Sequence, residues 1–151
     1  MLRRAAHDEA PAIAELWLQS RRAAPGIPPS AHSEQEVRAW FEEVLMPTRE
    51  VWVATAPRAG YEEPELVGMM ALHDEWVEQL YIALDHQHRG HGTRLLTVAQ
   101  ASRESLSLWA FEANLPARRF YEARGFVPVG EPSSDNEERT PAIRYHWTRP
   151  D

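Results

Sequence analysis

A glycine-rich turn in the middle of the chain is the first candidate for chemistry. Residues 87–92 read QHRGHG, and the stretch TRLLTVAQA that follows has the character of a helix. A helix start leaves backbone N–H groups without partners and carries partial positive charge, so it binds a phosphate or pyrophosphate readily. Gly90 and Gly92 allow the backbone to approach such a ligand closely, and Thr93 adds a hydroxyl group. The same residues could also form no more than a turn.

Two familiar phosphate-binding motifs do not fit this turn. A P-loop requires a lysine after its last glycine, and the chain contains no lysine. A dinucleotide-binding fingerprint requires a third glycine, which is missing here. The turn therefore presents a different pattern, Q-x-x-G-x-G.

Three histidines crowd the same loop and are candidate metal ligands. His86, His88 and His91 lie close to Asp85, and imidazole groups favour zinc or nickel. Their side chains cannot easily converge on a metal while the backbone amides of the loop face a pyrophosphate, so we expect no metal site. The chain has no cysteine, which excludes thiolate-bound metals, disulfides and a cysteine nucleophile.

Length and composition indicate one globular domain spanning residues 1–151. Apolar residues make up 43% of the chain and charged residues 26%. The net charge of −7 disfavours a nucleic-acid partner. No stretch has the pattern of a signal peptide or a membrane span, so we expect a cytoplasmic protein without a membrane partner.

The spacing of apolar residues predicts a mixed α/β fold. One helix is expected over residues 9–22 and another after a capping box at Ser33 and Glu36. Two more are expected over residues 93–104 and in PARRFYEAR. The element order becomes β-α-α-β-β-β-α-β-α-β-β, with helices packed on a central sheet. The second helix is expected to bury Val37, Trp40, Phe41, Val44 and Leu45, and the strands are LRRA, VWVATA, LVGMMAL, WVEQLYIAL, LSLWAF, FVPVG and AIRYHWT.

A second motif lies downstream of the turn. The segment NLPARRFYEARGF, residues 114–126, follows the predicted strand LSLWAF. It resembles motif B of the GNAT superfamily of N-acetyltransferases, N-x-x-A-x-x-F-Y-E-x-x-G-F, and LYIALDHQHRGHGTRLL resembles motif A, Q/R-x-x-G-x-G/A. IAELW and LVGMM also fit, so the resemblance covers nearly the whole chain. Leu84 stands where the family often has proline, and His88 stands where it often has glycine.

The resemblance implies a single GNAT-like domain with a mostly antiparallel twisted sheet, a splayed fourth and fifth strand pair, and helices on both faces. Acetyl-CoA would lie in the gap between the two strands, and its pantetheine arm would bind backbone groups of Ile82 and Leu84 and the side chain of Asn114. In the absence of that role, Ile82 and Leu84 are core residues and Asn114 is a helix N-cap. The pyrophosphate would bind the turn formed by Gln87, His88, Arg89, Gly90, His91, Gly92 and Thr93.

The resemblance also implies residues for proton transfer. Attack of an amine on the thioester expels a thiolate, and Tyr121 would protonate it as general acid. Glu78 would be the general base, and strand alternation puts it on the same face as Trp76 and Leu80. Tyr121 could instead be a packing residue and Glu78 a member of a surface ion pair. Other routes for the proton are solvent, or water held by His73, Asp74, Glu75 or Tyr145.

We therefore expect an acetyl-CoA-dependent N-acetyltransferase that acetylates a primary amine by direct attack in a ternary complex. The alternative is a non-catalytic acyl-CoA-binding regulatory domain of the same fold. Acetyl-CoA is the expected cosubstrate, and the acceptor is a small-molecule amine or a peptide amine. The segment AAPGIPPSAH, Trp76 and the C-terminal YHW are expected to shape the acceptor site. The protein would be a monomer or a homodimer.

Overall fold

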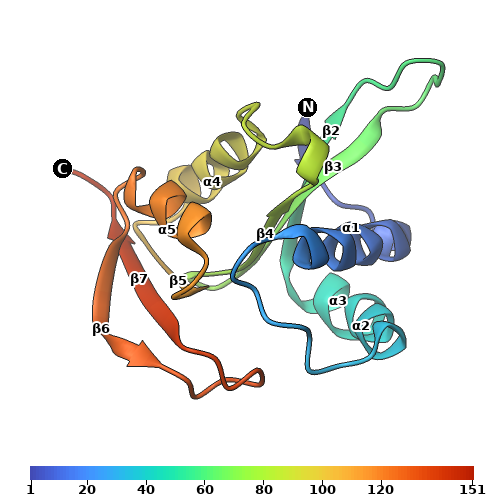
Figure 1. Ribbon diagram of the computed structural model, residues 1–151. Coiled ribbons are helices and arrows are strands. Elements are labelled where there is room, and N and C mark those ends of the chain that lie inside the picture. The colour runs from blue at the N-terminus through green and yellow to red at the C-terminus, as the bar shows by residue number, and fades with distance from the viewer.

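Seven strands form one mixed sheet in the computed structural model, which describes residues 1–151 (Figure 1). Their order across the sheet is β1-β2-β3-β4-β5-β7-β6, and only β4 and β5 run parallel. The predicted element order and the mostly antiparallel sheet are confirmed. The strands are β1 (Leu2–Arg4), β2 (Glu50–Ala56), β3 (Glu65–His73), β4 (Trp76–Ile82), β5 (Ser105–Phe111), β6 (Val127–Ser133) and β7 (Ala142–Thr148).

The strands β4 and β5 separate after a single point of pairing. Trp76 pairs with Ser107, and no later residues of the two strands pair with each other. On its other side β4 stays attached to β3, where the Ala83 N–H donates to the Val67 carbonyl at 2.8 Å. Because backbone groups alternate sides along a strand, those of Ile82 face the open gap. The predicted splayed strand pair is therefore confirmed, with backbone groups of β4 that are not paired with β5.

Helices cover both faces of the sheet, as predicted (Figure 1). No helix of the fold is long and apolar enough to cross a lipid bilayer. One face carries the 3₁₀ turn η1 (His7–Glu9), α1 (Ala10–Ala23), α2 (Glu34–Trp40), the π-helical turn η2 (Phe41–Leu45) and α3 (Met46–Thr48). The other face carries α4 (His91–Ser102) and α5 (Leu115–Glu122).

The helix after the proline-rich segment starts as predicted but buries fewer residues. The Ser33 N–H donates to the Glu36 carboxylate at 3.0 Å, and the Glu36 N–H donates to Ser33 Oγ at 3.1 Å. Trp40 and Val44 are each 36% exposed, which corrects the prediction that they are buried. The π-helical turn has more residues per turn than an α-helix, so buried positions recur every four residues here. Trp40 and Val44 each precede a buried position by one residue and are therefore partly exposed. The buried positions are Val37, Phe41 and Leu45.

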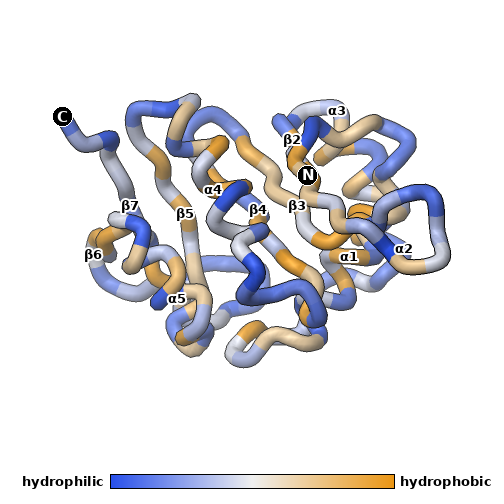
Figure 2. Tube along the Cα trace, turned by 90° about the horizontal axis from the view of Figure 1, so that it is seen from above, coloured by the Kyte–Doolittle hydropathy of each residue, from blue (hydrophilic) through white to orange (hydrophobic).

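Two apolar cores sandwich the sheet because alternate strand residues point to opposite faces. On β3, Met69 packs with α1 and η2, whereas Met70 packs with α4. Figure 2 shows hydrophobic stretches along β3, β4 and β5 and hydrophilic stretches in the connections. The gap between β4 and β5 therefore opens between two packed layers.

Helix α4 begins two residues earlier than predicted. Gly90 has a φ of +87° and is the N-cap, so His91 is already helical. A short 3₁₀ turn, η3 (Leu84–His86), joins the end of β4 to this point. Helix α4 consequently begins inside the QHRGHG segment, whose last two residues are His91 and Gly92.

Candidate active site

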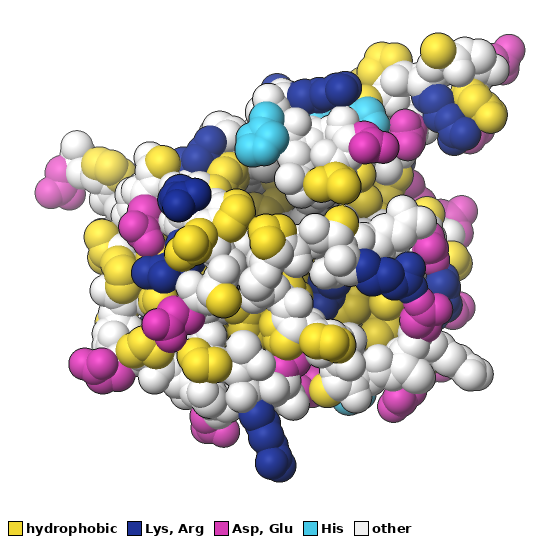
Figure 3. All heavy atoms as spheres, in the orientation of Figure 1, with side chains coloured by type: hydrophobic (Ala, Val, Ile, Leu, Met, Phe, Trp, Pro, Cys, Tyr) yellow, Lys and Arg dark blue, Asp and Glu magenta, His cyan; other side chains and the backbone are white.

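A cavity of about 940 Å³ lies where β4 ends and α4 begins. Volumes of this order are typical of small-molecule sites. Its walls come from both faces of the sheet, since α5 and the end of α1 both contribute. In Figure 3, histidine and arginine side chains stand on the upper rim above a hollow with hydrophobic side chains at its floor. Every predicted cofactor-binding residue except Arg89 lines this cavity, and so does Tyr121, whereas Glu78 does not.

The turn before α4 has the geometry of an anion cradle. The first helical hydrogen bond runs from the Arg94 N–H to the Gly90 carbonyl at 3.0 Å. The N–H groups of His91, Gly92 and Thr93 have no partner within the chain, and all three residues line the cavity. Unpaired amides at a helix N-terminus bind phosphate oxygens. This arrangement fits the pyrophosphate of acetyl-CoA.

Two further features of the turn depend on backbone conformation and close packing. A Cβ on Gly92 would lie 3.2 Å from the Phe120 ring, so glycine lets α5 approach the start of α4. His88 has a φ of +63°, in the left-handed region where glycine is favoured. The Gln87 side chain donates to the Ile82 carbonyl at 3.3 Å, on the open edge of β4. These residues shape the cavity rim between the strand and the helix.

Arg124, which sequence reasoning missed, adds a cation to the same place. Its guanidinium lies 3.8 Å from the Phe120 ring centroid and donates through Nε to Thr93 Oγ1 at 3.2 Å. It lines the cavity next to the unpaired amides. A fixed positive charge at this point favours an anionic ligand. The only sequence signal was a basic residue just before Gly125 in the second motif.

The three histidines line the cavity, but they do not form a ligand cluster. His91 Nδ1 lies 3.0 Å from Arg94 Nη2. Because a guanidinium nitrogen can only donate, His91 Nδ1 is the acceptor of this hydrogen bond. Burial, followed by the positive charge of Arg94, lowers the pKa of His91 and keeps its ring neutral. The ring of His86 is centred 6.2 Å from that of His91. No group of three or more histidine, cysteine or acidic side chains is placed to hold a metal ion.

Tyr121 stands in the cavity wall as a buried phenol. It is 9% exposed and packs edge-on against Phe120 and Phe126. Its hydroxyl makes no hydrogen bond within the chain. Burial raises the pKa of Tyr121 well above its ordinary value, so the hydroxyl keeps its proton. Tyr81 on β4, which sequence reasoning also missed, lines the same cavity, and burial raises its pKa too.

Asn114 combines both roles that its sequence position suggests. Its Oδ1 accepts from the Ala117 N–H at 3.3 Å, which makes it the N-cap of α5. It also lines the cavity, as Ile82 of β4 does. Leu84 lines the cavity as well and is 61% exposed, so it is not a core residue.

Glu78 lies away from the cavity because β4 contains a bulge. Val77 and Gln79 pair with consecutive residues of β3, which leaves Glu78 as the extra residue. The bulge breaks the expected alternation, so Val77 joins the core that Leu80 packs against, and Glu78 does not share the face of Leu80. Its carboxylate instead pairs with Arg49 Nε at 2.6 Å. The geometry gives no support to Glu78 as a base, and that role stays a prediction.

The other groups considered for proton removal also lie outside the cavity lining. His73 ends β3 and the next two residues form its turn to β4, at the paired end of the splayed strands. The Tyr145 hydroxyl is engaged, since it donates to Glu122 at 2.5 Å and accepts from Arg118 at 3.1 Å. Of the expected acceptor-site residues, the AAPGIPPSAH segment contributes Ala23, Ala24, Pro25 and Ile27 to the cavity, whereas Trp76 and YHW do not line it.

An anion cradle, an open strand edge and a protonated phenol, all in one cavity lined from two faces, define a transferase for a phosphate-bearing cosubstrate and a second substrate. A profile of the Acetyltransferase (GNAT) family matches residues 11–126. The chain belongs to this family and is an acetyl-CoA-dependent N-acetyltransferase.

One curated relative and two solved structures illustrate the similarity, and the two structures concern the fold alone. The chain is 29% identical over 149 residues to the peptidyl-lysine N-acetyltransferase YiaC of Escherichia coli, which covers 97% of this chain and 96% of that one. Its fold matches the solution structure of apo-form YjaB from Escherichia coli with a TM-score of 0.76, at 24% identity and 99% and 98% coverage. It also matches yncA of Salmonella typhimurium, solved with its cofactor acetyl-CoA, with a TM-score of 0.70, at 16% identity and 100% and 94% coverage.

Proposed function

We propose that this enzyme acetylates lysine side chains of other polypeptides by direct transfer from acetyl-CoA. The observation that carries the acceptor assignment is the likeness to YiaC, a peptidyl-lysine N-acetyltransferase, along 97% of the chain. The two-faced cavity supports direct transfer, because one substrate can enter along α4 and α5 while the other enters from the α1 side. The chain has no cysteine that could carry the acetyl group between two half-reactions.

The residues that line the cavity suggest which groups bind acetyl-CoA and which group transfers a proton. The amides of residues 91–93 and Arg124 bind the pyrophosphate, and the open backbone edge at Ile82 together with Asn114 binds the pantetheine arm. Acetyl-CoA supplies the acetyl thioester. The acceptor nitrogen bonds to the acetyl carbon as the carbon–sulfur bond breaks, and Tyr121 gives its proton to the departing sulfur. The proton lost by the nitrogen passes to solvent, from which Tyr121 is reprotonated.

The acceptor assignment is tested with an N-terminally blocked peptide that contains one lysine. The wild-type enzyme and acetyl-CoA should release coenzyme A and acetylate that lysine, as seen by mass spectrometry. A matched peptide with arginine in place of the lysine should not react. If small amines are acetylated and the lysine peptide is not, the peptidyl-lysine assignment is wrong.

A non-catalytic acyl-CoA-binding regulatory domain would be distinguished by binding of acetyl-CoA without turnover. At one hundred times its dissociation constant, acetyl-CoA should raise the free energy of unfolding by about 2.7 kcal/mol. ATP and NAD serve as controls for general nucleotide binding. A regulator would show this stabilisation with acetyl-CoA but would acetylate no amine of any class.

A further inference from the structure

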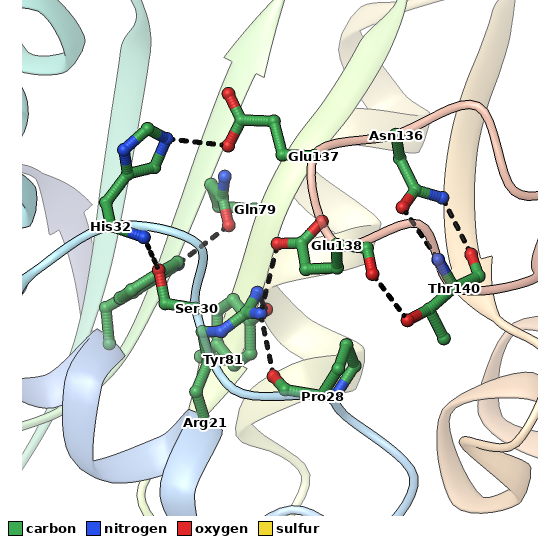
Figure 4. Close-up of polar contacts among 11 residues, drawn as sticks. Arg21, Pro28, Ser30, His32, Gln79, Tyr81, Asn136, Glu137, Glu138 and Thr140 are labelled. Atoms are coloured by element: carbon green, nitrogen blue, oxygen red, sulfur yellow. Dashed lines mark hydrogen bonds and ion pairs between the residues drawn. The ribbon is translucent and has the colours of Figure 1, made fainter.

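Two connections face each other on the α1 side of the open strand pair (Figure 4). They are the α1–α2 connection, residues 24–33, and the β6–β7 connection, residues 134–141. His32 Nε2 lies 2.8 Å from a carboxylate oxygen of Glu137, so the two connections touch across the opening. Residues of the α1–α2 connection line the cavity, and the β6–β7 connection lies against that connection.

The α1–α2 connection also crosses the gap between β4 and α5. A Cβ on Gly26 would lie 2.2 Å from the Ala113 carbonyl oxygen, so the two backbones are in direct contact just before Asn114. Pro25 and Ile27, on either side of that contact, line the cavity. The position of this connection therefore decides the shape of the acceptor side of the cavity.

Arg21, near the end of α1, holds both connections and β4 at once. Its Nη2 donates to the Pro28 carbonyl at 3.3 Å and to the Glu138 carboxylate at 3.4 Å. Its Nη1 donates to the Tyr81 hydroxyl at 3.4 Å. The guanidinium also lies over the Trp17 ring, 4.7 Å from its centroid. These contacts join four separate elements through one side chain (Figure 4).

The Glu138 end of this linkage is itself held in place. Asn136 Nδ2 donates to the Thr140 carbonyl at 2.7 Å, and the Thr140 N–H donates back to Asn136 Oδ1 at 3.1 Å. Thr140 Oγ1 donates to the Glu138 carbonyl at 3.0 Å. The side chains of Arg21 and Glu138 are only 11% and 16% exposed. Water and salt screen the Coulomb attraction of an ion pair less in such a shielded place than at the surface.

Arg21 does not line the cavity, but the residues it holds do. Tyr81 lines it directly, and so does most of the segment just before Pro28. The Nε donor of Arg21 is buried and has no partner within the chain, so the contacts of this guanidinium are made through Nη1 and Nη2. Arg21 thus acts on the acceptor side, on the opposite face of the sheet from the anion cradle.

We propose that Arg21 is a positioning residue for the acceptor, which fixes the two connections against Tyr81 and thereby sets acceptor affinity without affecting acetyl-CoA. The proposal rests on the N-acetyltransferase activity of the family. A planar guanidinium can serve three partners in fixed directions, whereas a lysine ammonium is a single point charge. The choice of arginine here is therefore a matter of geometry as well as charge.

The test compares Arg21→Gln with Arg22→Gln. Arg22 is the adjacent residue on the same helix, and its 57% exposed side chain pairs only with Glu34. In Arg21→Gln we expect the KM for the acceptor to rise about tenfold, as for loss of one charged hydrogen bond, while the KM for acetyl-CoA stays unchanged. Arg21→Lys should fall between the wild type and Arg21→Gln. Arg22→Gln should match the wild type in both constants.

Glu138 supplies the second arm of the test. Glu138→Gln should raise the acceptor KM, and Glu137→Gln, whose carboxylate contacts His32 at the surface, should do so much less. The double variant Arg21→Gln/Glu138→Gln should be no worse than Arg21→Gln alone, because the two residues act through one linkage. An unchanged acceptor KM in Arg21→Gln overturns the proposal, as does an equal rise in the KM for acetyl-CoA. If Arg21→Gln does not fold, Arg21→Lys and Glu138→Gln decide in the same way.

The proposed role of Arg21 and the assignment of lysine as the acceptor can be tested independently of each other. The wild-type enzyme alone shows whether a lysine peptide is acetylated. If it is not, the ratio of acceptor KM between the variants and the wild type is measured with a small amine that the wild type does acetylate. A purely structural role for Arg21 would lower the melting temperature and kcat without a selective change in the acceptor KM.

Discussion

The hydroxyl of Tyr121 combines two properties of a proton donor. Tyr121 lines the cavity that we propose for the thioester, and its hydroxyl has no hydrogen bond within the chain. Burial keeps it neutral, since the raised pKa places its ionisation above the pH at which enzymes work. The same burial makes a free tyrosinate costly, so in the proposed role Tyr121 is reprotonated after each transfer.

Replacement of Tyr121 by phenylalanine tests this role. The ring and its packing remain, and no hydrogen bond within the chain is lost, so the fold should be unaffected. We expect kcat to fall by about a hundredfold or more, as for loss of a general acid, with the acetyl-CoA dissociation constant unchanged. Steady-state kinetics and calorimetric titration measure the two quantities.

Tyr145→Phe is the matched control for that change. Its hydroxyl bonds to Glu122 and Arg118 outside the cavity lining. Its loss should therefore cost stability, about 1 kcal/mol, but leave kcat near the wild-type value. Full activity of Tyr121→Phe across the pH range would show that Tyr121 is a packing residue and that another group protonates the sulfur.

At the scale of elements, the start of α4 depends on the conformation of Gly90. Its φ of +87° makes it the N-cap, and the next three residues, whose N–H groups have no partner within the chain, line the cavity. Left-handed backbone costs a residue with a Cβ about 1–2 kcal/mol. We expect Gly90→Ala to lose about that much stability, as measured by urea unfolding, and to bind acetyl-CoA more weakly because the amides shift.

Gly60→Ala separates the two effects. Gly60 has a similar φ of +83°, in the connection between β2 and β3, and a Cβ there would meet nothing within 4 Å. It should lose a similar amount of stability with no change in acetyl-CoA binding. If Gly90→Ala binds acetyl-CoA as tightly as Gly60→Ala does, the cradle at the start of α4 is not the cosubstrate site.

The order of elements was predictable because its signals are local. Periodicity, the capping box at Ser33 and the glycine turn before α4 each depend on residues close together in the chain. Glu78 was placed on the wrong face because a bulge depends on how β3 and β4 pair, which alternation along one strand does not reveal. The start of α4 was missed by two residues because a histidine follows the capping glycine.

The side chains that complete the cavity were harder to predict. Arg124 reaches Thr93 from the turn after α5, and Arg21 reaches from α1 to Tyr81 on β4 and to Glu138 in the β6–β7 connection. Arginines are common on protein surfaces, so the residue type alone does not show that a particular arginine belongs to the site. The motifs predicted the residues that present backbone groups to the cavity, because those positions depend on glycine and helix starts. Partners brought together by the fold required the structure.

For the whole molecule, the tyrosines make stability depend on alkaline pH. Burial raises the pKa of Tyr81, Tyr121 and Tyr145, helped at Tyr145 by its bond to Glu122. Above about pH 10 the unfolded chain releases these protons while the folded protein keeps them. The unfolded state then binds fewer protons, so the free energy of unfolding falls as pH rises. No lysine titrates in the same range, since the chain has none.

Urea unfolding at a series of pH values measures this dependence. We expect no loss from these groups below about pH 9, and above pH 10 a fall of up to about 1.4 kcal/mol per pH unit for each buried tyrosine. Tyr81→Phe/Tyr121→Phe should flatten the alkaline slope, because two of the three groups are gone. Val67→Ala, which removes apolar packing in the α4 core and no titrating group, should lower stability at every pH and leave the slope unchanged. An unaltered slope in the double tyrosine variant would mean that the cavity is wet enough for its phenols to ionise in the folded protein, and a wet cavity would also weaken the argument that Tyr121 is held neutral for catalysis.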